Sequence, residues 1–366
     1  MIAPLVVADL NFDNSLLCPL NFTVAFDKFV LKSGWRNNCV KEKKLIHDDF
    51  ANWWDGVKFT RSNLVDENFL PSLDELLLRN DFKSFSKYGN KVEFAMNSLF
   101  VGGSQKKFIR ETLMRFQLCI IIVATSSFGA QDVLHHPLNF RPRDGVCFIA
   151  LVDKLTKDTY GFKDCESSWN VIELPEVISD DPRMKTRIIR ALLPFMFPRS
   201  TFSVWVDSKL QLQLDPLLLI EEHLVRREAY LAVSENHVRR NIYVESDKLA
   251  KMFHSTLSVN ESYDNHRSNL LKKCVDSYRI EGFNGEGLPD AGLFLRSNVQ
   301  EAVIFSLRWT QEILKYPFGR DQISFPYVAW KYRFSGVNLF HKCKYIEAVR
   351  EVGHVQRNGI QINIYN

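Results

Sequence analysis

The sequence predicts an α/β protein built on a mostly parallel β-sheet that helices cover on both faces. From about residue 116 onward, short apolar runs that suit buried strands alternate with helical patterns, and this alternation is typical of parallel sheets. The chain has 366 residues and a mass of 42.6 kDa, which is enough to bury a large core. Both observations favour one large domain with extensions.

The predicted strands are continuous apolar runs that end at polar or turn residues. The longest run, 118–124, is far shorter than the roughly 18 apolar residues of a membrane helix, so it indicates a buried strand. The predicted strands comprise residues 117–125, 146–152, 169–174, 202–212, 230–234 and 291–295.

The predicted helices are identified by their start signals. Asp181 and Asp215 can each cap a helix, and the proline that follows each of them suits the first helical position. Pro194 should end or kink the first of these helices. Ser297 and Gln300 have the spacing of a capping box. The predicted helices comprise residues 182–194, 216–227, 245–253, 267–278, 297–315 and one that starts near Ser324, which would put Pro326 in its first turn.

Residues 1–112 show no sustained hydrophobic period apart from helical leucine spacing within 66–78. Tryptophans at 35, 53 and 54 favour packed structure over a disordered arm. We therefore predict an accessory N-terminal segment over 1–112, a main domain over 113–345, and a tail over 346–366 with one or two short strands.

Charge and motifs exclude several classes of protein. The net charge of +4 is too small to indicate a nucleic-acid partner. The chain has neither a signal peptide nor a membrane anchor that the sequence reveals, so we expect a soluble chain, and a cytosolic location stays open. The absence of GxGxxG, GxxxxGK[ST], GxSxG and HExxH motifs argues against dinucleotide oxidoreductases, P-loop NTPases, α/β-hydrolases and zinc proteases.

The seven cysteines form no CxxC pair and show no metal-finger spacing. Cys119 and Cys147 lie in apolar runs and are predicted to be core thiols. A bridge between residues 18 and 39, or between Cys165 and Cys274, would be possible in an oxidising compartment. Two glycosylation acceptors, at Asn21 and Asn260, are compatible with a secretory location.

Asp207 and Lys209 are the main candidates for a binding site. They follow the apolar part of the strand 202–212 and lie two residues apart, so their side chains share one face near the edge of the sheet. Ligands bind at that edge in open α/β sheets. A helix cap or an internal Asp207–Lys209 ion pair is the alternative.

A second candidate is a basic stripe of Arg183, Arg187 and Arg190 on the helix before this strand. Its spacings of four and three residues place the guanidinium groups on one side of the helix. The stripe could face a polyanion, such as a donor diphosphate or an acidic acceptor, or it could be a solvated basic face.

Residues from about 120 to 330 resemble the plant-rich glycosyltransferase-like domain family named after turgor-regulation-defect and mucilage-related proteins. The residues that carry the resemblance are ATSSFGAQD at 124–132, VCF at 146–148 with Asp153, LP at 193–194 with FP at 197–198, FSVWVDSKLQL at 202–212 with DP at 215–216, and RDQISF at 320–325. The resemblance implies a GT-A-like fold and a Golgi-type transferase that acts on cell-wall or mucilage polysaccharides.

The resemblance implies roles for the strand end. GT-A enzymes hold a divalent metal and a nucleotide-sugar diphosphate at an Asp-x-Asp motif, and here Lys209 replaces the second acid. One carboxylate is a poor site for Mg²⁺ or Mn²⁺. We therefore expect Asp207 to bind the ribose or a weakly held metal, and Lys209 to contact the pyrophosphate as a point charge. Arg187 is a further candidate for the donor diphosphate.

The same resemblance implies a base and ribose pocket lined by Phe128, Gly129 and Asp153, although a turn glycine and a capping aspartate are the alternative. It also implies a reaction centre at Asp321 and Gln322, where a retaining enzyme places an Asp-Gln pair beside the transferred sugar; the alternative is an N-cap aspartate.

Two histidines complete the candidate site residues. His237 follows a predicted strand and could contact a phosphate or the acceptor, and His341 could be a late metal ligand. A lone histidine is more often structural, and this is the alternative at both positions.

We therefore predict a retaining glycosyltransferase that uses a nucleotide-sugar donor, with a UDP-sugar favoured, to transfer a hexosyl group to a polysaccharide or glycoconjugate in the Golgi. Two rivals remain. One is a ceramidase-like lipid amide hydrolase, an activity also attached to the family, for which no histidine shows ligand spacing. The other is a non-catalytic binding protein with the same fold, which the missing second acid favours.

Overall fold

The computed structural model describes residues 116, 119–138, 145–160, 168–174, 181–197, 200–255, 261–318 and 320–352. The predicted accessory segment 1–112 and both glycosylation acceptors lie outside the described residues. So do the cysteines at 18, 39 and 165.

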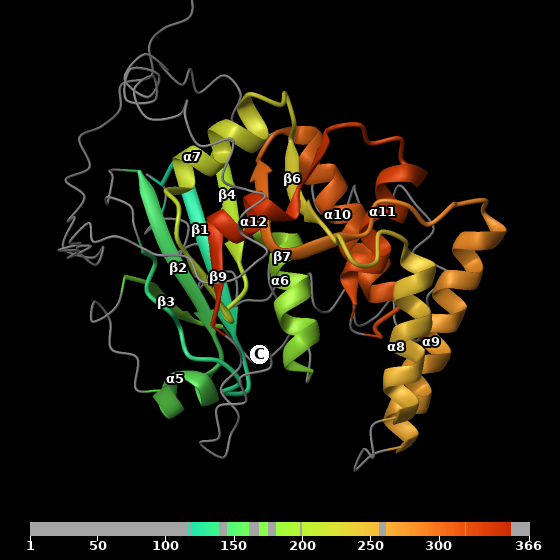
Figure 1. The fold of residues 1–366 in the computed structure, drawn as a ribbon. Coiled ribbons are helices and arrows are strands. Elements are labelled where there is room, and N and C mark those ends of the chain that lie inside the picture. The colour runs from blue at the N-terminus through green and yellow to red at the C-terminus, as the bar shows by residue number, and fades with distance from the viewer. Residues whose placement is uncertain are drawn as a thin grey trace, which may run out of the picture.

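A seven-stranded sheet forms the centre of the described part, with strand order β3-β2-β1-β4-β7-β6-β8 (Figure 1). Every neighbouring pair is parallel except the two that involve β7, which runs against β4 and β6. The predicted mostly parallel α/β sheet is confirmed. Its strands are β1 (Ile121–Ser127), β2 (Val146–Val152), β3 (Asn170–Glu173), β4 (Phe202–Val206), β6 (Leu231–Glu235), β7 (Pro289–Ser297) and β8 (Val337–Phe340).

Helices cover both faces of this sheet, as predicted. Strand residues alternate between the two faces, so each face has its own apolar core. One core packs against α6 (Pro182–Met196), α8 (Ile242–Ser255), α9 (Glu261–Ile280), α10 (Gln300–Lys315) and α11 (Asp321–Lys331). The other packs against α7 (Pro216–Ile220), the π-helical turn η5 (Glu221–Val225), α12 (Lys342–Ala348) and a two-stranded ribbon of β5 (Leu210–Leu212) and β9 (Val349–Glu351).

The predicted start signals of α6 and α7 are confirmed. Asp181 accepts a hydrogen bond from the main-chain N–H of Arg183 at 2.9 Å, and Asp215 accepts one from Leu217 at 2.9 Å. Pro194 lies inside α6, which ends only two residues later, at Met196. The short helices α5 (Lys154–Tyr160) and α12 were not predicted, because neither is long enough to show an apolar period.

The helices predicted from 245 and 267 begin earlier, at Ile242 and Glu261, and two further predicted starts are wrong. Ser297 is the last residue of β7 and pairs with Phe202, so α10 begins at Gln300 without a side-chain cap. The last predicted helix starts at Asp321 and carries Pro326 in its interior. Most of α11 is buried, and packing of this kind can outweigh the hydrogen bond that an interior proline removes.

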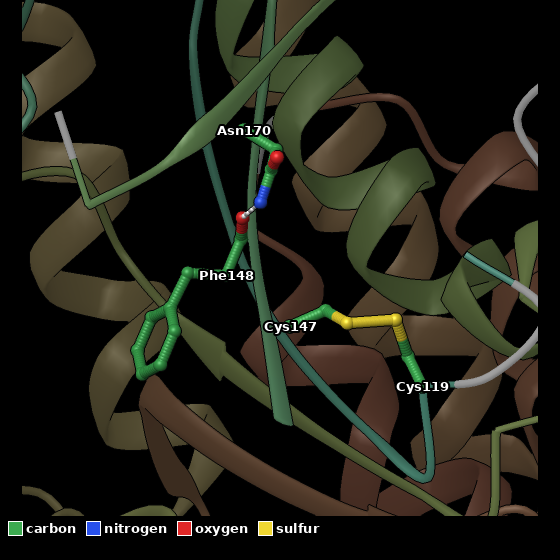
Figure 2. Close-up of a disulfide and its surroundings, with 4 residues drawn as sticks. All are labelled: Cys119, Cys147, Phe148 and Asn170. Atoms are coloured by element: carbon green, nitrogen blue, oxygen red, sulfur yellow. Dashed lines mark hydrogen bonds between the residues drawn. A yellow bond between two sulfur atoms is a disulfide. The ribbon is translucent and has the colours of Figure 1, made fainter. Parts of the chain in front are cut away.

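The prediction that Cys119 and Cys147 are plain thiols is also wrong, because the two form a disulfide across a Cα–Cα distance of 5.7 Å (Figure 2). The parallel register of β1 and β2 pairs Ile122 with Cys147. Cys119, just before β1, therefore lies close to Cys147. Cys274 is a free, buried thiol, so the predicted pairing of Cys165 with Cys274 is wrong as well.

α8 and α9 lie side by side at the end of the molecule away from β3 (Figure 1). Among the described helices, none combines the length and the apolar character that crossing a membrane requires.

Candidate active site

The candidate site begins at the end of β4. Asp207 follows β4 directly, and its N–H donates to the carbonyl of Gly292 on β7 at 2.8 Å. A Cβ at Gly292 would lie 2.8 Å from the hydroxyl of Tyr345 and 3.6 Å from Oδ2 of Asp207. The glycine therefore lets Tyr345 of α12 and the Asp207 carboxylate approach the same point of β7.

Two side chains hold the Asp207 carboxylate. Nε1 of Trp205, two residues earlier in β4, donates to Oδ1 at 2.8 Å, and Nη1 of Arg190 lies 3.5 Å from the same oxygen. Burial raises the pKa of Asp207 above its ordinary value, although Arg190 and Lys209 act against this. The side chain keeps 27% of its surface exposed, so a ligand can still reach it.

Lys209 lies close enough to Asp207 for each charge to stabilise the other. The predicted single strand 202–212 is wrong, however, because β4 ends at Val206 and β5 begins at Leu210, so both residues lie in the turn between the two strands. Burial opposes the Lys209 charge, but Asp207 and Glu351 outweigh it and raise the pKa of Lys209, so the ammonium stays charged. Its Nζ lies 3.5 Å from the carboxylate of Glu351 on β9. Asp207 and Lys209 therefore interact with each other, and each also has a further partner, Arg190 for Asp207 and Glu351 for Lys209.

Arg190 is the centre of the site. Its Nη2 donates to the carboxylate of Asp321, its Nη1 donates to the carbonyl of Ala291 on β7, and the same Nη1 lies beside Asp207. The guanidinium is buried and lies 5.7 Å from the ring centre of Trp309. One side chain therefore connects the strand end to the first residue of α11.

Asp321 is only 4% exposed and contacts two arginines. Nε of Arg187 lies 3.4 Å from Oδ1, while Arg190 binds Oδ2. Burial alone would raise the pKa of Asp321, but Arg190 and Arg187 outweigh it and hold that pKa below its ordinary value. Asp321 is therefore ionised and fixed in place, which an N-cap role does not account for.

The basic stripe is not a solvated face. Arg187 and Arg190 turn inward to Asp321, and only Arg183 among the three is exposed. Burial, together with the neighbouring Arg320 and Arg190, lowers the pKa of Arg187 to about 10. Nη1 of Arg187 is buried without a hydrogen-bond partner among the described residues.

A small cavity of about 10 Å³ borders Asp321 at the start of α11. Arg320 lies at its wall, and Nη1 of Arg320 donates to Oε1 of Gln322 at 3.2 Å. The lining residues are Met184, Arg187, Cys274, Glu312, Ile313, Tyr316, Phe318, Arg320, Asp321 and Ser324. The buried carboxylate of Asp321 thus borders a space no larger than about one water molecule.

The residues of the predicted base and ribose pocket, Phe128, Gly129 and Asp153, belong to a loop that hydrogen bonds hold in place. Gly129 has φ +66° and its N–H donates to Oδ2 of Asp153 at 2.8 Å, while Oδ1 of Asp153 accepts from the N–H of Thr156 at 2.9 Å. Phe128 is 3% exposed and packs in the core, with Nζ of Lys185 5.9 Å from its ring centre. These contacts match the alternative of a turn glycine and a capping aspartate, and the donor-binding roles of the three residues stay predictions.

The two candidate histidines lie on the surface. His237 is exposed after β6. Nδ1 of His341 accepts from the N–H of Cys343 at 3.2 Å and caps α12, and its Nε2 lies 3.9 Å from Glu235. The helix cap gives His341 a structural role.

The residues at the strand end do not fit a divalent metal. Mg²⁺ and Mn²⁺ prefer several oxygen ligands, and here one carboxylate stands between Arg190 and Lys209. Among the described residues, there is no group of three or more His, Cys, Asp or Glu side chains that could hold a metal ion. The charge that a metal would supply is present as side-chain cations.

Sequence reasoning missed the central role of Arg190 and the ion pair of Lys342 with Asp290, 2.6 Å apart, at the edge formed by β7 and α12. The helical spacing of the arginines was visible, but it could not reveal which carboxylates they contact. Asp290 and Lys342 had no motif around them, so no signal in the sequence marked them.

Comparison with known proteins gives a family and two similar proteins. The family described as "TOD1/MUCI70, glycosyltransferase-like domain" matches residues 99–354. The chain is 27% identical over 223 residues to "Probable hexosyltransferase MUCI70" of Arabidopsis thaliana, covering 56% of this chain and 36% of that protein. It is 26% identical over 234 residues to "Alkaline ceramidase TOD1" of the same plant, covering 59% of this chain and 49% of that protein. The aligned part thus spans less than half of either relative.

Among solved structures, the chain is similar to the bifunctional glycosyltransferase WbbM, with 15% identity, a TM-score of 0.34, and coverage of 61% of this chain and 39% of that chain. It is also similar to mouse xyloside xylosyltransferase 1, with 10% identity, a TM-score of 0.34, and coverage of 60% and 84%. Scores of this size do not add to the fold assignment.

The family assignment depends on how much of the chain the family model matches. The match includes every described strand and helix, from β1 to β9, and therefore the whole constellation around Arg190. This confirms the resemblance that the sequence motifs indicated. The chain belongs to the TOD1/MUCI70 glycosyltransferase-like domain family.

Proposed function

We propose that this chain is a nucleotide-sugar-dependent glycosyltransferase of the retaining type. The observation that carries the proposal is the Arg190 bridge, which joins Asp207 at the end of β4 to Asp321 at the start of α11. A donor presents a diphosphate and a sugar to one site, and this bridge holds together the two places where they would bind.

The diphosphate binds at Lys209 without a divalent metal. Lys209 is charged, its side chain is 32% exposed, and its partner Glu351 is itself 44% exposed, so a stronger anion can displace that carboxylate. Asp207, held by Trp205, accepts from the ribose hydroxyls. UDP is the favoured nucleotide, with Gly129 and Asp153 near the base and ribose.

The sugar binds beside Asp321 and Gln322, where the side chains that line the cavity of about 10 Å³ must move apart to admit it. Asp321 is ionised and held in place by Arg187 and Arg190, so its carboxylate is positioned to orient the acceptor hydroxyl. Gln322 is only partly buried and hydrogen-bonds sugar hydroxyls. The transferred group is a hexosyl unit, in line with the name of one relative.

The acceptor is a polysaccharide or glycoconjugate, and the chain works in the Golgi lumen. The disulfide between Cys119 and Cys147 supports that location, because disulfides form and persist in oxidising compartments.

Binding of UDP and of UDP- and GDP-sugars, measured by calorimetry with EDTA and with Mn²⁺, tests the proposal. We expect UDP to bind equally well in EDTA. Lys209→Ala should weaken UDP binding by roughly tenfold or more, because one charge-assisted contact contributes about 1.5–3 kcal/mol. Transfer of the sugar with retained anomeric configuration, followed by NMR, completes the assignment.

Lys331→Ala is the matched control. Lys331 also forms an ion pair with a partly exposed glutamate, Glu281 at 3.0 Å, but it lies at the opposite end of α11 from Asp321. Its removal should leave UDP binding unchanged. A wild-type chain that binds no nucleotide under any of these conditions would refute the proposal.

A lipid amide hydrolase is the second candidate, since one relative bears the name alkaline ceramidase. Fatty-acid release from ceramide that Asp207→Asn abolishes, without turnover of any sugar nucleotide, would favour it. Binding of UDP without transfer from any donor would instead favour a non-catalytic binding protein.

A further inference from the structure

The helix that carries Arg190 contains a main-chain defect next to the site. In an α-helix the carbonyl of residue 190 accepts from the N–H of residue 194, but Pro194 has no N–H and its ring pushes that carbonyl aside. The carbonyl oxygen of Arg190 therefore needs a donor from outside α6. A buried carbonyl without one would carry an energetic cost.

Arg296 supplies that donor. Its Nη2 lies 3.1 Å from the carbonyl oxygen of Arg190 and donates to it across the interface between β7 and α6. Arg296 is 1% exposed and lies 5.0 Å from the ring centre of Phe294. Its Nε and Nη1 have no hydrogen-bond partner among the described residues.

The position of Arg296 is otherwise unfavourable. Burial first, and then the neighbouring charge of Arg190, lower the pKa of Arg296 to about 9. An apolar side chain such as methionine would fill the same space without burying a charge. The hydrogen bond to the Arg190 carbonyl is the contact that distinguishes arginine from such a side chain.

β7 contacts both the guanidinium group and the main-chain carbonyl of Arg190. The carbonyl of Ala291 on β7 accepts from the guanidinium, and Arg296 on the same strand donates to the main chain of Arg190. A guanidinium that bridges two carboxylates must be fixed to within a fraction of an ångström, since hydrogen bonds weaken steeply with distance and angle.

We propose that Arg296 is a positioning residue, which replaces the helix hydrogen bond that Pro194 cannot make and so fixes Arg190 between Asp207 and Asp321. The inference rests on the proposed function for its role in donor binding. The hydrogen-bond replacement itself can be tested without that function.

The test is a double-mutant cycle of Arg296→Met and Pro194→Ala, because alanine at position 194 returns an N–H to the Arg190 carbonyl. Arg296→Met alone should weaken UDP binding about tenfold in calorimetry. Pro194→Ala with Arg296→Met should bind UDP within about twofold of Pro194→Ala. Equal affinity of Arg296→Met and wild type, or no rescue by Pro194→Ala, would overturn the proposal.

Urea unfolding of the same four proteins separates this inference from the proposed function. Arg296→Met should lower the unfolding midpoint more in the wild-type background than in the background of the Pro194→Ala variant. This holds even if the wild type binds no nucleotide. Equal shifts of the unfolding midpoint in the two backgrounds would contradict the inference without contradicting the proposed function. If Arg296→Met alone does not fold, the double variant must fold, and its failure to do so would also count against the inference.

Discussion

Nε1 of Trp205 donates to Oδ1 of Asp207 at 2.8 Å, so the strand that delivers the carboxylate also supplies the group that orients it. Trp205 lies in β4, and Asp207 is the first residue after the strand ends at Val206. The same oxygen lies 3.5 Å from Arg190. The direction of the Asp207 carboxylate is therefore set before any substrate arrives.

Replacing Trp205 with phenylalanine should weaken UDP binding several-fold, because the loss of a hydrogen bond to the charged form raises the pKa of Asp207 further and lets the carboxylate turn. Calorimetry measures the affinity, and urea unfolding should show a loss of about 1–3 kcal/mol. Trp169→Phe is the control. Nε1 of Trp169, just before β3, also donates a hydrogen bond, to the carbonyl of His135 at 2.9 Å, but β2 and β1 separate β3 from β4 in the sheet. It should cost similar stability and leave UDP binding intact.

Replacing Asp321 with asparagine should destabilise the fold by about 3 kcal/mol, because two buried arginines lose their carboxylate. Urea denaturation measures the change. Asp276→Asn breaks an exposed ion pair with Arg279, in which both side chains are about half exposed, and should cost less than about 1 kcal/mol. Similar losses in the two variants would contradict the buried double ion pair.

Replacing Cys119 and Cys147 together with alanine should lower the unfolding free energy by about 3–4 kcal/mol, because the disulfide closes a loop with a sequence separation of 28. Urea unfolding with and without reductant measures this. Reductant should destabilise the wild type more than the double variant. A wild-type chain that reacts with a thiol reagent at both positions in its native, oxidised state would rule out the bridge.

Stability should fall as the pH drops from about 6.5 to about 4, and His223 should account for about 3 kcal/mol of that fall. His223 is 3% exposed and stacks on Phe340 with ring centres 4.2 Å apart, and burial lowers its pKa to about 4. Between these pH values His223 binds a proton in the unfolded chain but not in the folded chain. Each unit of pKa difference changes the free energy of unfolding by about 1.36 kcal/mol.

His223→Phe, compared with His266→Gln at an exposed site on α9, measures the contribution of His223. Thermal unfolding across the pH window should flatten in the first variant and keep the wild-type slope in the second. An unchanged slope in His223→Phe would show that another group titrates.

Much of the fold could be predicted because it depends on local patterns. Strand β2 has the predicted bounds, and the caps at Asp181 and Asp215 form as their sequences indicate. The start of α11 was misplaced because an interior Pro326 is tolerated only when tertiary packing supports the helix. The sequence named Asp207, Lys209, Asp321 and the basic stripe that contains Arg190, but not the contacts through which Arg190 connects the two aspartates.

The sequence by itself determined the α/β class, the charged end of β4 and the family, because apolar runs, caps and motif order are properties of neighbouring residues. Only the tertiary structure decided that Arg190 bridges Asp207 and Asp321, that Arg296 donates to the carbonyl of Arg190, and that Cys119 meets Cys147. Each of these contacts joins segments that the order and register of the strands bring together. A one-dimensional pattern carries no information on that register.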